Sequence, residues 1–265
     1  MMNLLKRYPV TTFFLIAYVI SWTINIVLDI TQINFVPFKL VAEFAPTFAA
    51  LIVTTALYGS GGVRALLARV GKWRVGLRWY ALVLIEPVAV QLLGFGGYTL
   101  LGGHVQFRSP GLGFLFILFL GLILSVGEEI GWRGFALPHL QSRMSMLGAS
   151  LVIGILWGLW HTPNQLSSLA VFALPSTYLA LLSYVAFTCV GSFLMSWVYN
   201  RTEGSIFLMI IFHLTLTIAG LFFATPSLQP GQIGPTELTT LLQCLIILVA
   251  ALTIRARKHV QQAVA

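Results

Sequence analysis

Two adjacent glutamates, Glu128 and Glu129, closely follow the apolar stretch GLGFLFILFLGLIL at residues 111–124. Only seven Asp and Glu residues occur in the whole chain, and two of them stand together here. A glutamate side chain is too short to reach from the hydrocarbon layer to water, as lysine and arginine do. Negative charge near the C-terminal end of a helix also opposes the helix dipole. Because the pair costs stability on both counts, it predicts a functional site.

Helical spacing gives the two carboxylates different neighbours. Glu129 and Arg133 are four residues apart, so they lie on one face and are predicted to form an ion pair. Glu128 projects about 100° away, and the positions three and four residues further on hold Gly131 and Trp132, which carry no charge. A carboxylate without a counter-ion is available to take a proton from water. Glu128 is therefore the candidate general base, with Glu129 and Arg133 as its support.

Two histidines complete the candidate catalytic set. His161 follows the segment GILWGLW, and His213 lies within IFLMIIFHLTLT, one turn before Thr217. Counting along straight helices places Glu128, His161 and His213 at roughly 12, 20 and 13 Å from one membrane side, at 1.5 Å per residue. Ionisable side chains inside membrane spans are costly and mark functional sites. We therefore expect these three side chains, from three different helices, to converge.

The composition predicts a membrane protein. The 265 residues are 58% hydrophobic and 8% charged, whereas a soluble domain is about 25% charged. A helix needs about 20 apolar residues to cross the hydrocarbon core. The sequence therefore predicts an all-α, polytopic transmembrane bundle, with residues 1–265 forming one domain. About eight segments qualify: 11–31, 41–58, 79–101, 111–136, 148–166, 177–198, 204–225 and 237–254.

The positions of lysine and arginine predict the orientation. With the N-terminus inside, thirteen of them, Arg133 included, fall on the inner side, and only Lys39 and Arg108 fall on the outer side. The positive-inside rule then places both termini in the cytoplasm, and the first apolar segment is interpreted as an uncleaved span. The net charge of +8 follows from this asymmetry, so no nucleic-acid partner is expected. Cys189 and Cys244 lack the spacing of a disulfide framework or metal site.

The other acidic residues in or near spans are interpreted differently. Asp29 and Glu43, near the outer ends of the first two spans, can reach the headgroups and are interpreted as structural. Glu86 lies deeper, in the third span, and is a weaker candidate for lining a cavity. Small-residue motifs at 127–131 and 154–158 permit close backbone approach. They predict that the fourth and fifth spans pack against each other.

With these residues in place, the chain resembles the CAAX-protease and bacteriocin-processing (CPBP, or Abi) family of intramembrane endopeptidases, which includes the type II CAAX prenyl endopeptidases. The family signature is Glu-Glu-x-x-x-Arg, aromatic-x-x-x-His and His-x-x-x-Asn, each on a separate transmembrane helix. The matching residues are Glu128 and Glu129 with Arg133, Trp157 with His161, and His213 with Thr217. The expected catalytic core is about 111–225. Trp157 stands where phenylalanine is usual, and Thr217 where asparagine is usual.

The resemblance implies a membrane-embedded metalloprotease that cuts a peptide bond near the cytoplasmic membrane surface. Glu128, helped by His161, would activate a water molecule, and His213 with Thr217 would stabilise the oxyanion. A divalent metal, zinc first among them, would take Glu128, His161 and His213 as ligands; the sequence leaves open a metal-bound or a glutamate-activated water. Implied partners are a CAAX-type, leader-peptide or membrane-protein substrate, together with lipid, in the bacterial cytoplasmic membrane.

Two other functions stay open at this point. A non-catalytic protein of the same fold would act as an immunity factor or scaffold, and the threonine at 217 favours this alternative. A proton-coupled transporter would use the same glutamate and histidines as a relay, but broken helices and repeated halves are typical of transporters. The sequence shows neither feature.

Overall fold

The computed structural model describes residues 2–33, 35–107, 111–165, 175–224, 234–235 and 237–245. The helices are α1 (Met2–Arg7), α2 (Pro9–Thr31), α3 (Val36–Glu43), α4 (Ala45–Ala68), α5 (Leu77–Leu100), α6 (Gly113–Glu129), α7 (Leu137–Gln141), α8 (Met146–Trp160), α9 (Thr162–Gln165), α10 (Pro175–Arg201) and α11 (Ile206–Ile218). A π-helical segment, Ile130–Ala136, joins α6 to α7 and is called the π segment below. Within the described ranges, one short antiparallel ladder pairs β1 (Gln106–Phe107) with β2 (Phe223–Ala224).

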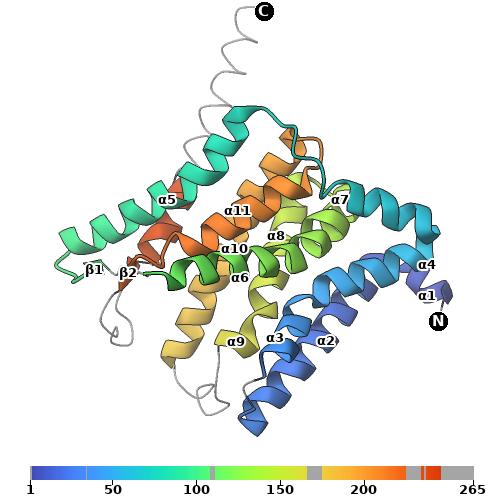
Figure 1. Ribbon diagram of the computed structural model, residues 1–265, viewed down its shortest axis with the longest axis horizontal. Helices are drawn as coiled ribbons and strands as arrows, with labels where there is room; N and C mark the ends of the chain where they lie inside the picture. The colour runs from blue at the N-terminus through green and yellow to red at the C-terminus, as the bar shows by residue number, and fades with distance from the viewer. Residues whose placement is uncertain are drawn as a thin grey trace, which may run out of the picture.

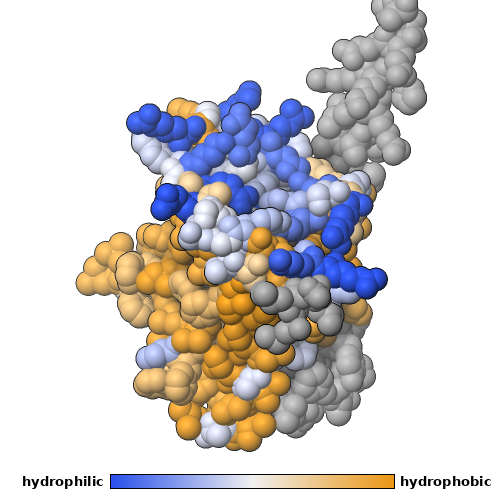
Figure 2. Space-filling view, turned by 90° about the vertical axis from the view of Figure 1, so that its right-hand side faces the viewer, coloured by the Kyte–Doolittle hydropathy of each residue, from blue (hydrophilic) through white to orange (hydrophobic). Residues whose placement is uncertain are grey.

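The helices form a bundle whose surface is apolar over most of its height. In Figure 1, α2, α3 and α4 make one flank and α5 the other, with α6, α8, α10 and α11 between them. On the face that Figure 2 shows, hydrophilic residues gather at one end above a broad hydrophobic surface. Five helical segments are long and apolar enough to cross a membrane, namely α2, α4, α5, Gly113–Gln141 and most of α10. The chain is therefore an all-α integral membrane protein, as the composition predicts.

Two of the predicted spans are shorter than a full crossing. α8 has 15 residues and α11 has 13, although both are apolar throughout. The last predicted span, 237–254, is helical over residues 237–245, and the rest of it lies outside the described residues. The number of eight spans and the cytoplasmic position of both termini stay predictions.

Proline and glycine decide where the second predicted span bends. It is divided between α3 and α4, which meet at Phe44, and Pro46 stands in the first turn of α4, where a missing N–H is tolerated. α4 bends again at Gly59, whose φ of 63° suits a residue without Cβ. Pro138 lies in the first turn of α7, where a missing N–H is tolerated, so it does not interrupt the helical segment Gly113–Gln141.

The small-residue motifs mark close contacts, but with other helices than predicted. A Cβ on Gly154 in α8 would clash with the backbone of Cys189 in α10, and Thr188 Oγ1 of α10 donates to the Gly154 carbonyl at 2.8 Å. A Cβ on Gly131 in the π segment would lie 2.6 Å from the main-chain carbonyl of Pro46 in α4. The small-residue motifs therefore do not pair the fourth span with the fifth, and these two spans meet instead through side chains such as Trp157 and Glu128. α8 packs on α10, and the π segment packs on α4.

Helix α2 supports the end of α8 that leads to His161. The Tyr18 hydroxyl donates to the Leu156 carbonyl at 2.5 Å, and Trp22 Nε1 donates to the Trp160 carbonyl at 3.0 Å. Trp160 is the last residue of α8, where carbonyls lack partners within the helix. These two hydrogen bonds therefore stabilise the C-terminal end of α8 and fix its position against α2.

We expect Gly154→Ala to lower the free energy of unfolding by about 1–3 kcal/mol, the usual cost of overpacking, because the α10 backbone cannot move aside as a side chain can. Gly96→Ala in α5 is the matched control, since a Cβ there meets nothing within 4 Å. That change should be neutral or slightly stabilising. Thermal unfolding of the purified proteins in detergent compares the two, and equal midpoints would contradict the assigned α8–α10 packing.

Candidate active site

The two adjacent glutamates lie where α6 joins the π segment. Single π-helical turns inside α-helices are rare and often occur at functional sites. Both carboxylates are inside the bundle, with 3% of Glu128 and 0% of Glu129 exposed. Thr47 Oγ1 in α4 donates to the Gly127 carbonyl at 2.7 Å, one residue before the pair. The junction is therefore fixed against α4 by a hydrogen bond as well as by packing.

Glu129 is bound by two partners on the same oxygen. Arg133 Nη1 donates to Glu129 Oε1 at 2.7 Å, and His213 Nδ1 of α11 lies 2.8 Å from that oxygen. The predicted ion pair is confirmed. A carboxylate in an ion pair only accepts, so Nδ1 of His213 carries a hydrogen and Nε2 is left for another partner. Arg133, counted with the inner-loop charges in the sequence, is fully buried and therefore belongs to the bundle interior.

Glu128 is held by two indole N–H groups. Trp132 Nε1 and Trp157 Nε1 donate to Glu128 Oε2 at 3.2 and 2.6 Å. The sequence offered Trp132 only as an uncharged neighbour, yet its N–H is a donor to this carboxylate. Trp157 supplies a hydrogen bond that phenylalanine, the usual residue of the motif, could not make. Glu128 Oε2 is thus stabilised by neutral donors, and Oε1 is left facing the histidines.

The imidazole rings of His161 and His213 both direct Nε2 towards Glu128 Oε1. His161 Nε2 lies 3.9 Å from that oxygen, and His213 Nε2 lies 3.8 Å from it. His161 follows the last residue of α8, and its Nδ1 lies 2.9 Å from the Trp157 carbonyl, which only accepts. Nε2 of His161 can therefore accept a hydrogen bond or bind a metal, and Nε2 of His213 accepts when its ring is neutral and donates when the ring is protonated. The three side chains predicted to converge do meet, at separations longer than a direct hydrogen bond.

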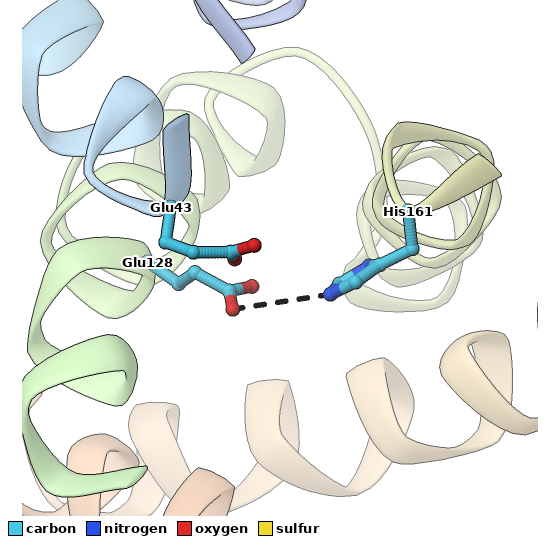
Figure 3. A group of neighbouring side chains, drawn as sticks. All are labelled: Glu43, Glu128 and His161. Carbon is cyan, nitrogen blue, oxygen red and sulfur yellow. Dashed lines mark ion pairs between the residues drawn. The ribbon is translucent and has the colours of Figure 1, made fainter. Parts of the chain in front are cut away.

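Glu43 joins the same group, which the sequence interpretation did not anticipate. In Figure 3 its carboxylate lies beside that of Glu128, and both point towards the His161 ring. Ligand atoms of Glu43, Glu128 and His161 lie within 4.8 Å of one another. Among the described residues, this is the group with metal-ligand spacing, and it contains Glu43 in place of the predicted His213.

The helix that carries Glu43 explains why it was taken for a headgroup contact. α3 has eight residues and ends at Glu43, so the carboxylate lies about 12 Å of helix away from the loop that precedes α3. The sequence feature that could have revealed this position is Pro46, which stands in the first turn of the helix that follows Glu43. A boundary between helices at this point places the acid inside the bundle instead of at its rim.

Two other candidates lie apart from this group. Thr217 is exposed, and its hydroxyl donates to the His213 carbonyl at 3.0 Å. The structure therefore does not bring the Thr217 hydroxyl to the carboxylates. Glu86 lies on α5, outside the group formed by Glu43, Glu128 and His161.

Comparison with known proteins identifies the region that holds most of these residues. Residues 110–219 match a family described as type II CAAX prenyl endopeptidase Rce1-like. The predicted resemblance is confirmed over this region. A CAAX prenyl protease 2 from Methanococcus maripaludis is 34% identical over 155 residues, which are 54% of this chain and 56% of that protein. The chain thus matches about half the length of this curated relative.

The matched family region contains the double glutamate, Arg133 and both histidines, and it ends shortly after Thr217. Glu43 lies well before its first residue. A family signature confined to 110–219 could not have identified Glu43, because only the folding of α3 and α4 against α6 brings that carboxylate to Glu128.

We expect Arg133→Met to lower the free energy of unfolding by about 3–5 kcal/mol, the usual cost of leaving one member of a buried ion pair without its partner. The double change Glu129→Gln with Arg133→Met removes both charges and should recover much of this loss. Unfolding of the three proteins in detergent provides the comparison. If the single and double variants were equally unstable, the loss would come from packing and the ion pair would not be its cause.

Proposed function

We propose that the chain is an intramembrane endopeptidase of the CAAX-protease type. One observation carries the proposal: two imidazole Nε2 atoms face Glu128 Oε1 while two indoles hold Oε2. A carboxylate and imidazoles at this spacing suit the activation of one water molecule. The match of residues 110–219 to type II CAAX prenyl endopeptidases supports the same reaction.

The proposed reaction assigns each proton to a named atom. Glu128 Oε1 takes a proton from a water molecule that His161 Nε2 helps to orient, and the water oxygen attacks the carbonyl carbon of the scissile peptide bond. An imidazolium at His213, ion-paired with Glu129, donates from Nε2 to the oxyanion. When the carbon–nitrogen bond breaks, the proton on Glu128 passes to the leaving amine.

The oxyanion role falls to His213 alone in this proposal. The family motif would share it with residue 217, but Thr217 Oγ1 already donates to a main-chain carbonyl. A histidine fixed by a buried carboxylate is a better-oriented donor, because its ring cannot turn without breaking the bond to Glu129.

We also propose a divalent metal, with zinc first, held by Glu43, Glu128 and His161. Two ligands of one tetrahedral zinc ion with bonds of about 2.1 Å are about 3.4 Å apart. Ligand atoms within 4.8 Å of one another therefore need to approach each other by at most about 1.4 Å. Carboxylates this close repel each other unless a cation or a proton lies between them. A zinc ion bound here would take Glu128 as a ligand and would supply Lewis-acid activation of water in place of proton abstraction by Glu128.

The substrate and the surroundings belong to the same proposal. A peptide or membrane protein, with a CAAX-type C-terminus or a leader segment, would be cut in the cytoplasmic membrane of a bacterium. The basic end of the bundle would face the cytosol. His161 lies about 22 Å of α8 away from the turn that holds Arg143, so the scissile bond would be cut inside the bundle and not at its cytoplasmic surface.

Glu128→Gln tests the reaction itself. Glutamine keeps the size and an acceptor oxygen for the indoles but removes the base, so cleavage should fall by about 10²–10⁴-fold. Mass spectrometry of membrane peptides and cleavage of a fluorogenic CAAX-type peptide both measure it. Glu86→Gln, which removes a different intramembrane carboxylate, is the control and should keep normal activity. Unchanged cellular function in Glu128→Gln would instead favour the non-catalytic scaffold, and loss of proton-coupled uptake would favour the transporter.

Glu43→Gln tests the metal ligands without reference to activity. We expect the purified wild-type protein, dialysed against zinc, to retain one ion per chain by elemental analysis. Loss of a residue that only supports a metal ligand typically weakens metal affinity by roughly 10–100-fold. Glu43→Gln removes a direct ligand, so its affinity for zinc should fall by more than this. His139→Gln, at a histidine outside the group, should bind normally. Equal zinc retention in Glu43→Gln and wild type, with loss in His213→Gln, would restore the ligand set predicted from sequence.

A further inference from the structure

A cavity of about 180 Å³ lies at the basic end of the bundle, away from the candidate active site. It is bounded by the loop between α4 and α5 and by the turn between α10 and α11, which lie side by side at the top of Figure 1. Its wall includes three cationic side chains, an indole and a carboxylate: Lys72, Arg74, Arg201, Trp79 and Glu203. The cavity is therefore strongly positive at its rim.

Hydrogen bonds between the two connections hold the cavity in shape. Ser205 Oγ donates to the Lys72 carbonyl at 2.7 Å, and Ile206 N donates to the Arg69 carbonyl at 3.1 Å. Arg69 Nη1 also donates to the Tyr199 hydroxyl at 2.7 Å. These bonds join parts of the chain more than 100 residues apart. The walls are thus preorganised, which lowers the entropic cost of binding a ligand.

The cations of the cavity differ in how they are engaged. Lys72 Nζ pairs with Glu203 Oε2 at 2.9 Å, and this hydrogen bond holds the pKa of Glu203 below its usual range, so the carboxylate is charged at neutral pH. Among the residues that the structure describes, no carboxylate lies within ion-pair distance of Arg74 or Arg201. The Arg74 guanidinium lies 5.2 Å from the ring centroid of Trp73. Two guanidinium groups are therefore available to an anion.

The cavity lies at the ends of two helices that are long and apolar enough to cross a membrane. α5 begins at Leu77 and α10 ends at Arg201, so the walls are formed where two membrane-spanning helices leave the apolar layer. Trp79 packs edge-on against Trp197, with ring centroids 5.4 Å apart, and indoles are enriched at this depth of a membrane. Leu77 is 81% exposed, which leaves apolar surface beside the cavity for an acyl chain.

We propose that this cavity binds the phosphate group of an anionic phospholipid. Guanidinium groups match phosphate oxygens in geometry and charge. Positive charge that only set the orientation of the chain would not need to converge on one preorganised cavity. Free phosphate offers the same chemistry, but the adjacent apolar surface of α5 favours a ligand with acyl chains. The inference is independent of the proposed protease activity.

Native mass spectrometry of the detergent-purified protein, titrated with phosphatidylglycerol, measures the affinity of the cavity for this lipid. Removing one cation, as Arg74→Gln or Arg201→Gln, should weaken binding about fivefold, as expected for one basic residue near an anionic lipid surface. Arg64→Gln is the matched control, because Arg64 is an exposed cation at the same end of α4 but outside the cavity. All three side chains are exposed, so each variant should fold normally.

A variant that is expected to strengthen lipid binding provides a second test. Among the described residues of the cavity wall, Glu203 alone is acidic, so Glu203→Gln removes that negative charge, frees Lys72 and should strengthen binding of phosphatidylglycerol. Phosphatidylcholine, whose headgroup carries no net charge, should bind more weakly than phosphatidylglycerol. Equal losses in Arg64→Gln and Arg201→Gln would overturn the proposal, since attraction would then be diffuse. Displacement of the lipid by millimolar inorganic phosphate would overturn the lipid assignment and leave a site for a soluble anion.

Discussion

One buried carboxylate oxygen connects the elements of the candidate site. Glu129 Oε1 is in contact with both Arg133 of the π segment and His213 of α11. The Arg133 guanidinium in turn lies 4.6 Å from the ring centroid of Trp157 on α8. Because a charge buried in an apolar bundle is stable only with its partners in place, this contact restricts how α6, α8 and α11 can be arranged. The orientation of His213 and of Trp157 both follow from it.

The chemistry proposed for Glu128 depends on the different partners that bind the two neighbouring glutamates. Glu129 is neutralised by a cation, whereas Glu128 Oε2 is held by the N–H groups of Trp132 and Trp157. Neutral donors orient a carboxylate without cancelling its charge, so the other oxygen keeps its ability to accept a proton. Tryptophan at 157 is therefore more than an aromatic replacement for phenylalanine, since its indole N–H fixes the proposed base.

The two ends of the molecule suit different interactions. The candidate active site combines residues from within the family-matched region with Glu43 from an earlier helix. The basic end, by contrast, presents a preorganised cavity, formed by the loop between α4 and α5, which precedes that region, and by the turn between α10 and α11, which lies within it. A membrane hydrolase needs both a polar interior and a fixed position relative to the lipid surface. These two features lie at different levels of the bundle, so a substitution in one of them does not remove a contact of the other.

Local sequence patterns determined the membrane-spanning class, the Glu129–Arg133 pair and the set of helices that carry Glu128, His161 and His213. These follow from hydrophobicity and from spacing within one helix, which do not depend on what the helix packs against. Only the tertiary structure decided that Glu43 meets Glu128, that two indoles bind Glu128 Oε2, and that Gly154 faces α10. Each of these depends on the rotation and depth of one helix against another, which depend on contacts between residues far apart in the chain.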